Sequence, residues 1–296
     1  MRKSKNLIDS IIQQVEHLPT IPPIVIRVLA MAESPHINAV ELSRVMDQSL
    51  AAKVLRVANS AYYGGRVCRN VTSLPHAIVL IGFDAVKEII LTTSFFHTLH
   101  DAQDILSIQP LWKHSLECAL VSKRLAWIYR YPSLDEAYFS GLIHDIGKLI
   151  IHQYFPDQQQ EIENRKKTIG TLEAEKEILG LTHAEVGAKV ANYWHFPETI
   201  LEVILHHHDQ KWQQNAKLGK IIHFSDLFVQ GRIDFSSMLK TLSEEGMPYP
   251  AIWDSSDLQE VDRIIREELN KALSMFNSTM TLTRQELLVN PIAQNQ

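Results

Sequence analysis

The chain has 296 residues, 45% of them hydrophobic and 21% charged, with a formal net charge of -5 at pH 7. This composition is that of an ordinary globular protein, and the acidic balance argues against a nucleic-acid surface, which requires clustered lysines and arginines. No apolar run is long enough to span a membrane. The two cysteines, Cys68 and Cys118, provide neither a disulfide framework nor a cysteine-based zinc site. We therefore expect a cytoplasmic protein with no nucleic-acid and no membrane partner.

Helix-start signals recur along the first hundred residues, whereas strand signals are nearly absent, so the sequence predicts an all-α fold. Each start is marked by a residue that caps a helix or is tolerated in its first turn. The helix that begins at Ser49 is expected to end by Gly64-Gly65, because glycine accepts a positive φ. The predicted starts are Pro22-Pro23, Asn38, Ser49, Ser73 and Asp84.

The clearest break in the chain is the polar segment from Leu99 to Gln109, which Pro110 follows. We place a boundary there, because a chain of this length favours two packed units over one core. The sequence thus predicts an N-terminal helical bundle over residues 1–105 and a second helical unit over residues 106–231. A C-terminal helical extension and tail follow over residues 232–296.

The remaining two thirds of the chain carry further helix signals. Two capping boxes are present, one at Ser133 and one at Thr182, and the second places His183 at the first position of its helix. Irregular chain is expected around Met247-Pro248-Tyr249-Pro250. The predicted helices run from Pro110 to Tyr131, from Ser133 to His144, onward from Thr182, from Pro197 to His208, from Lys217 to Gln230 and from Leu258 to Phe276.

The run His144-Asp145-Ile146-Gly147-Lys148 is the most informative one for chemistry. An imidazole and a carboxylate on neighbouring residues suit a divalent metal ion, and Gly147 allows the chain to turn closely around it. Lys148 is placed to meet a phosphate. Taken alone, an adjacent His-Asp pair is more often structural than a metal site.

Further candidate ligands lie at helix ends or inside helices that can converge, which is how helical bundles build metal sites. His206 is left out, because consecutive helical residues point about 100° apart and three in a row cannot face one ion. A shell rich in nitrogen and free of thiolate fits iron, manganese or zinc equally well. The sequence therefore predicts one or two divalent ions at a site formed by His114, His144, Asp145, His183, His207, His208 and Asp226.

This set of residues resembles the metal-binding set of the HD superfamily of metal-dependent phosphohydrolases, in the arrangement found in HD-GYP domains. Motifs in the first hundred residues resemble the more specific signature of HDOD domains. These motifs are Leu18-Pro19-Thr20-Ile21-Pro22, Asp47-Gln48-Ser49-Leu50, Leu55-Arg56-Val57-Ala58-Asn59-Ser60-Ala61 and Ala77-Ile78-Val79-Leu80-Ile81-Gly82.

The resemblance implies an all-α fold in which an N-terminal helical bundle is packed against an HD-like helical unit, and a role in bacterial signal transduction. HDOD domains are generally regarded as regulatory modules, and many have lost the HD ligands that this chain keeps. No Gly-Tyr-Pro follows His207-His208-Asp209, so we do not expect cyclic-di-GMP phosphodiesterase activity.

If two ions bind, Asp145 is the natural bridge, because one carboxylate can serve two cations through its two oxygens. The other ligands then divide into two groups around it. His114, His144 and Asp226 complete one ion, and His183, His207 and His208 complete the other.

Two functions follow from the resemblance. The first is a regulatory protein that acts through protein or ligand binding and receives its signal in trans from a signalling protein that the sequence does not identify. The second is a metal-dependent phosphohydrolase that acts on a nucleotide or phosphoester, in which Asp145 and Lys148 are the catalytic residues.

Overall fold

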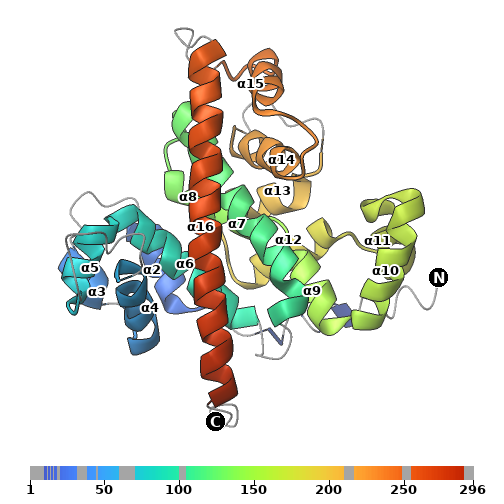
Figure 1. Cartoon of the computed structure of the whole chain (residues 1–296). Helices are drawn as coiled ribbons and strands as arrows, with labels where there is room; N and C mark the ends of the chain where they lie inside the picture. The colour runs from blue at the N-terminus through green and yellow to red at the C-terminus, as the bar shows by residue number, and fades with distance from the viewer. Residues whose placement is uncertain are drawn as a thin grey trace. The chain divides into compact units, whose positions relative to one another are not determined.

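In the computed structural model, every regular element of the described residues is an α-helix, as the sequence predicts (Figure 1). Among these residues, no helix is both long and apolar enough to cross a membrane. The described residues are 10, 11, 13, 15, 17, 18, 21–31, 39–44, 46–59, 71–99, 105–209, 217–248 and 255–289.

The chain folds into two compact units. The first comprises Met1–Thr20 and Leu106–Leu269, and the second comprises Ile21–Ile105 and Asn270–Gln296. The division at residues 105, 231 and 296 that the sequence suggests stays a prediction.

The second unit is built from short helices that pack through aliphatic side chains. Helix α2 packs on α6, while α5 contacts α3, α4 and α6. Its buried residues include Val28, Val54, Ile78 and Ile90. The helices are α2 (Pro23–Met31), α3 (Ala39–Arg44), α4 (Gln48–Ala58), α5 (Leu74–Ile81) and α6 (Phe83–Leu99).

Two predicted starts in this unit are wrong by one or two residues. Asp47, not Ser49, caps α4, because its backbone is extended and its carboxylate accepts the Leu50 N–H at 2.8 Å. Asp84 lies in the first turn of α6 and does not precede it. Helix α4 ends at Ala58, while Gly64-Gly65 and Asn38 lie outside the described residues.

The Asn59 side chain joins two separate segments of this unit. Its amide nitrogen donates to the carbonyl oxygens of Leu55 and Val71, at 2.9 and 2.8 Å, and its amide oxygen accepts the Val71 N–H at 2.8 Å. One polar side chain thereby ties the end of α4 to the chain that leads into α5.

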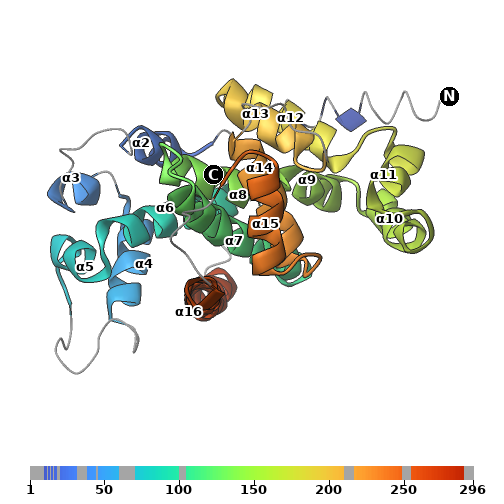
Figure 2. The ribbon, with the colours of Figure 1, turned by 90° about the horizontal axis from the view of Figure 1, so that it is seen from above.

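The first unit contains the remaining helices, and Figures 1 and 2 show α10 and α11 side by side within it. These helices are α7 (Ile105–Ile128), α8 (Leu134–Ile143), α9 (Ile146–Tyr154), α10 (Pro156–Ile169), α11 (Thr171–Leu179), α12 (His183–Tyr193), α13 (Glu198–His206), α14 (Lys217–Val229) and α15 (Phe235–Glu244). The first part of α16 (Ser255–Val289) also belongs to it.

An apolar core holds this unit together. Leu125 of α7, Ile221 of α14 and Leu239 of α15 are fully buried in one cluster, and Ile265 of α16 packs into the same cluster. Because these helices come from distant parts of the chain, their shared core fixes the positions at which α7 and α14 present polar side chains.

Two sequence expectations for this unit require correction. Helix α7 begins at Ile105, so Pro110 lies inside it and does not start it. No helix was expected between Arg232 and Met247, yet α15 forms there, and the Asp234 carboxylate caps it by accepting the Ser237 N–H at 2.9 Å. Burial of Met238 and Leu239 stabilises this helix, and the sequence marks it with a capping aspartate and apolar residues at helical spacing.

Close helix contacts depend on glycine at Gly147 of α9. A Cβ atom at this position would lie 1.9 Å from the His183 carbonyl oxygen and 2.8 Å from the Gly187 nitrogen. Glycine therefore allows the backbones of α9 and α12 to touch, and this contact brings His183 beside the His144-Asp145 pair.

Candidate metal centre

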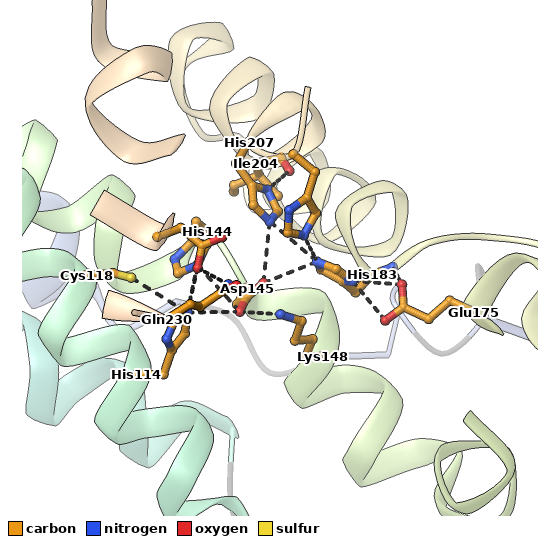
Figure 3. A network of polar contacts seen from close by, with 12 residues as sticks. His114, Cys118, His144, Asp145, Lys148, Glu175, His183, Ile204, His207 and Gln230 are labelled. Atoms are coloured by element: carbon orange, nitrogen blue, oxygen red, sulfur yellow. Dashed lines mark hydrogen bonds and ion pairs between the residues drawn. The ribbon is translucent and has the colours of Figure 1, made fainter. Parts of the chain in front are cut away.

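Five segments of the first unit bring polar side chains to one point between the helices (Figure 3). His144 ends α8, Asp145 precedes α9, and His183 begins α12 behind the predicted Thr182–Glu185 capping box, which the structure confirms. The structure brings together all seven residues of the predicted set. They divide into two adjacent groups, and each group also satisfies the spacing needed to hold a metal ion.

The first group consists of His114, His144 and Asp226, with Cys118 beside them. The Nε2 atoms of His114 and His144 are 3.4 Å apart, and the Asp226 Oδ1 atom lies 3.1 Å from the first and 3.8 Å from the second. Asp145 Oδ2 lies 3.5 Å from both Nε2 atoms. All these atoms therefore surround one small space.

The second group consists of His183, His207 and His208 with the other oxygen of Asp145. The Nε2 atom of His183 lies 3.4 Å from that of His207 and 2.9 Å from that of His208. Asp145 Oδ1 is 3.2 Å from His183 Nε2 and 3.5 Å from His207 Nε2. The two oxygens of this one carboxylate thus face different groups.

The histidine rings are oriented by acceptors behind them. The Nδ1 atom of His144 donates to the Gly141 carbonyl oxygen at 2.8 Å, and that of His207 donates to the Ile204 carbonyl oxygen at 2.7 Å. A carbonyl oxygen can only accept, so both Nδ1 atoms carry protons and, in neutral rings, each Nε2 offers its lone pair to the centre. This is the orientation of histidine ligands whose second nitrogen is held by a supporting acceptor.

Glu175 of α11 orients the His183 ring in the same way. Its carboxylate accepts the His183 Nδ1 proton, with the nearer oxygen at 2.7 Å, and that same oxygen accepts the His183 N–H at 2.8 Å. Both side chains are buried. On the other side of the centre, Gln230 donates to Asp226 Oδ1 at 2.5 Å.

The carboxylates of Asp145 and Asp226 remain ionised. Burial raises the pKa of Asp145, but Lys148 and His144 outweigh it and hold this pKa well below the ordinary value. Burial likewise raises the pKa of Asp226, and hydrogen bonds with His114 and His144 bring it well below the ordinary value. The centre therefore carries negative charge on two buried side chains.

The pKa values of the histidines shift in opposite directions. Burial lowers the pKa of His144, but Asp145 and Asp226 raise it on balance. In contrast, burial lowers the pKa of His207 to about 4 and that of His208 to about 2, so these two rings are neutral near pH 7. The centre favours bound positive charge, which either protons or a metal cation can provide.

Ligand spacing supports a metal cation. With bonds of about 2.05 Å to nitrogen, a tetrahedral ion separates two nitrogens by about 3.4 Å, and an octahedral ion separates neighbouring nitrogens by about 2.9 Å. These are the separations of His114 from His144, and of His183 from His208. The buried Asp145 Oδ1 atom accepts no hydrogen bond from any described residue. Lone pairs that face each other in this way fit a divalent ion between them.

Access to the centre is limited to a few side chains. Lys148 is 23% exposed and His114 is 20% exposed, whereas His144, His183 and His207 are fully buried. The Lys148 Nζ atom donates to Asp145 Oδ2 at 2.6 Å. His208 is also partly exposed, so a ligand from solvent would meet Lys148, His114 and His208 first.

Two residues at this centre were not predicted from the sequence. Cys118 was set aside because no second cysteine stands near it, although it follows His114 by one helical turn, a spacing that puts both on one face of α7. Glu175 lies in a charged stretch and gives no local sign that it is buried against His183. His206 faces away, as expected, and pairs with Asp209.

Comparisons with known proteins agree with this architecture. A protein from Treponema pallidum (strain Nichols), itself uncharacterised, is 20% identical over 212 residues; these cover 70% of this chain and 40% of the relative's length. This chain therefore spans less than half of that relative.

Crystal structures share the fold. An HDOD domain protein of unknown function from Geobacter sulfurreducens has a TM-score of 0.64 at 22% identity, covering 94% of this chain and 97% of its own. A protein from Shewanella amazonensis SB2B, provisionally named a phosphohydrolase, has a TM-score of 0.66 at 21% identity, with 90% and 96% covered. A protein from Marinobacter aquaeolei VT8, provisionally named a signal transduction protein, has a TM-score of 0.72 at 19% identity, with 94% and 66% covered.

Similarity at these identities establishes the fold alone. The family follows from the sequence itself, because residues 18–210, well over half of the chain, match the HDOD domain. This segment includes the N-terminal motifs and every predicted ligand except Asp226. The chain therefore belongs to the HDOD domain family.

Proposed function

We propose that this chain is a bacterial signal-transduction protein whose first unit binds two divalent metal ions and, beside them, a phosphate-bearing ligand. The observation that carries the proposal is the position of Asp145, whose two oxygens lie 3.2 to 3.5 Å from histidine Nε2 atoms of two separate groups. A carboxylate that formed only a structural ion pair would not need histidine nitrogens beside both of its oxygens.

We assign the residues to the two ions by the distances between their ligand atoms. His114, His144 and Asp226 would hold the first ion, His183, His207 and His208 the second, and Asp145 both. When bound, such a metal pair attracts phosphate oxygens and lowers the pKa of water. Iron, manganese and zinc all suit these ligands.

Lys148 supplies the additional charge for a phosphate. Its ammonium group lies 2.6 Å from Asp145 Oδ2 and remains partly exposed. Asp145 and Asp226 raise the pKa of Lys148 on balance, although burial lowers it, so the side chain stays cationic. A partly exposed cation beside the centre can meet an anionic ligand that approaches from solvent.

A second candidate function, hydrolysis of a nucleotide or phosphoester, is favoured by the completeness of the ligand set. In that case Asp145 and Lys148 are the catalytic residues, Lys148 binds the phosphate, and Glu175 keeps His183 in place. The missing Gly-Tyr-Pro after His207-His208-Asp209 argues against cyclic-di-GMP as the substrate. Signalling without turnover remains our leading proposal, with the signal arriving from a partner protein in trans.

Titration of the full chain, reloaded with Mn²⁺, with pyrophosphate and a panel of nucleotides tests this proposal. We expect binding that requires metal and that weakens about tenfold or more in Lys148→Met, because a charge-assisted contact of roughly 1.5 to 3 kcal/mol is lost. Lys166→Met is the matched control, since Lys166 pairs with Glu163 on the surface of α10. The proposal would be contradicted if the metal-free chain bound the phosphate compounds as tightly as the Mn²⁺-loaded chain does. Hydrolysis of one of these compounds by the wild type but not by Asp145→Ala would establish the second candidate instead.

A further inference from the structure

The first metal group contains a side chain that has no assigned role. Cys118 lies on α7 one turn after His114 and is fully buried. Its Sγ atom is 3.6 Å from His114 Nε2, the contact drawn in Figure 3. The sulfur and the ligand atoms of His114, His144 and Asp226 all lie within 4.8 Å of one another. Cys118 thus faces polar ligand atoms, whereas a core cysteine faces apolar side chains.

The position of the sulfur fits a bond to the same ion. With bonds of about 2.3 Å to sulfur and 2.05 Å to nitrogen, a tetrahedral ion separates the two ligand atoms by about 3.6 Å. This is the observed separation of Cys118 Sγ from His114 Nε2. The nitrogens of His114 and His144 show the matching separation for two nitrogen ligands. Cys118 therefore lies close enough to join His114, His144, Asp226 and Asp145 around the same ion.

We propose that Cys118 is a thiolate ligand of the ion held by His114, His144 and Asp226, an inference that rests on the two-metal site proposed above. Binding replaces the S–H bond with a sulfur–metal bond and releases the proton to solvent, because a coordinated thiol is deprotonated. The first site then has nitrogen, oxygen and sulfur ligands, whereas the second has nitrogen and oxygen only. Ions that favour sulfur, such as Zn²⁺ and Co²⁺, are held preferentially at the first site.

The alternative is that Cys118 only donates a weak S–H hydrogen bond to His114. The two possibilities differ in the spectrum of the Co²⁺-loaded protein, because a thiolate ligand gives an intense charge-transfer absorption in the near ultraviolet that nitrogen and oxygen ligands do not give. The test therefore has a readout that does not depend on any activity.

The experiment uses the full chain, stripped with chelator and titrated with Co²⁺, as wild type, Cys68→Ser and Cys118→Ser. In Cys68→Ser the only remaining thiol is Cys118, so this variant tests the inference even if Cys118→Ser fails to fold. We expect two Co²⁺ per chain and the thiolate band in wild type and Cys68→Ser. In Cys118→Ser the band should be lost while Co²⁺ stays bound at the second site.

Two Co²⁺ per chain without a thiolate band in Cys68→Ser would overturn the inference and leave the two-metal site intact. An undiminished band in folded Cys118→Ser would overturn it as well. A wild-type chain that binds no Co²⁺ would overturn both the inference and the proposed function on which it rests.

Discussion

Replacement of Glu175 by glutamine should weaken metal binding at the second group without unfolding the chain. One oxygen of the buried Glu175 carboxylate accepts both the Nδ1 proton and the backbone N–H of His183, at 2.7 and 2.8 Å. Glutamine keeps the shape but removes the charge and puts an N–H group on one of the two acceptor positions. Loss of such a supporting partner typically reduces metal affinity about 10 to 100-fold, or roughly 1.4 to 2.7 kcal/mol.

The assay is competition for Zn²⁺ with a chelator of known affinity, combined with a thermal melt of the metal-free protein. Glu177→Gln on the same helix is the matched control, because Glu177 is exposed and pairs with Arg165. It should bind Zn²⁺ as the wild type does. Equal Zn²⁺ affinity in Glu175→Gln and Glu177→Gln would refute the claim that Glu175 positions His183 as a ligand.

Three further predictions concern packing, a side-chain link and pH. Gly147→Ala should lower the free energy of unfolding by about 3 kcal/mol in chemical denaturation, because the new Cβ would lie 1.9 Å from the His183 carbonyl oxygen; a change below about 0.5 kcal/mol would contradict the close contact. Asn59→Ala removes three hydrogen bonds and should cost about 1 to 3 kcal/mol in the same assay. Asn192→Ala, at an exposed position of α12, serves as reference. Metal affinity should fall as the pH drops, because a protonated His183 Nε2 cannot bind metal. Burial and Lys148 lower the pKa of His183, but its carboxylate partners raise it on balance, so the fall should begin above the ordinary histidine pKa of 6.5. Affinity that does not change with pH in chelator competition would be inconsistent with His183 as a ligand.

Features with local causes could be predicted from the sequence. The Thr182–Glu185 box forms as predicted, because it depends on hydrogen bonds within one turn. At Ser133 only half of the predicted box forms: Ser133 caps α8, while the Glu136 carboxylate accepts hydrogen bonds from Tyr131 and Thr199. Where two neighbouring residues had similar capping chemistry, local reasoning chose the wrong one, and Asp47 rather than Ser49 caps α4. Helix α15 was missed although Asp234 caps it and its buried apolar residues, among them Phe235, Met238 and Leu242, follow the spacing of one helix face.

At the candidate site, too, the sequence identified residue types, whereas the three-dimensional arrangement came from packing. Histidine and aspartate types identified the seven residues, and the fold brings them together, but their distances come from packing at Gly147 and from the shared core. Glu175 could not be predicted, because its burial against His183 depends on where α11 lies. Cys118 was within reach of sequence reasoning, since it stands four residues after His114, yet a lone cysteine gives a weak signal without the neighbouring helices.

The central claim is that Asp145 serves two metal ions, and elemental analysis of chelator-free protein tests it most directly. We predict two equivalents of iron, manganese or zinc in the wild type and in His206→Ala, whose imidazole faces away and is 47% exposed. Asp226→Ala and His207→Ala should each retain one equivalent, and Asp145→Ala should retain none. Wild-type protein without metal, or a folded Asp145→Ala with two equivalents, would contradict the account.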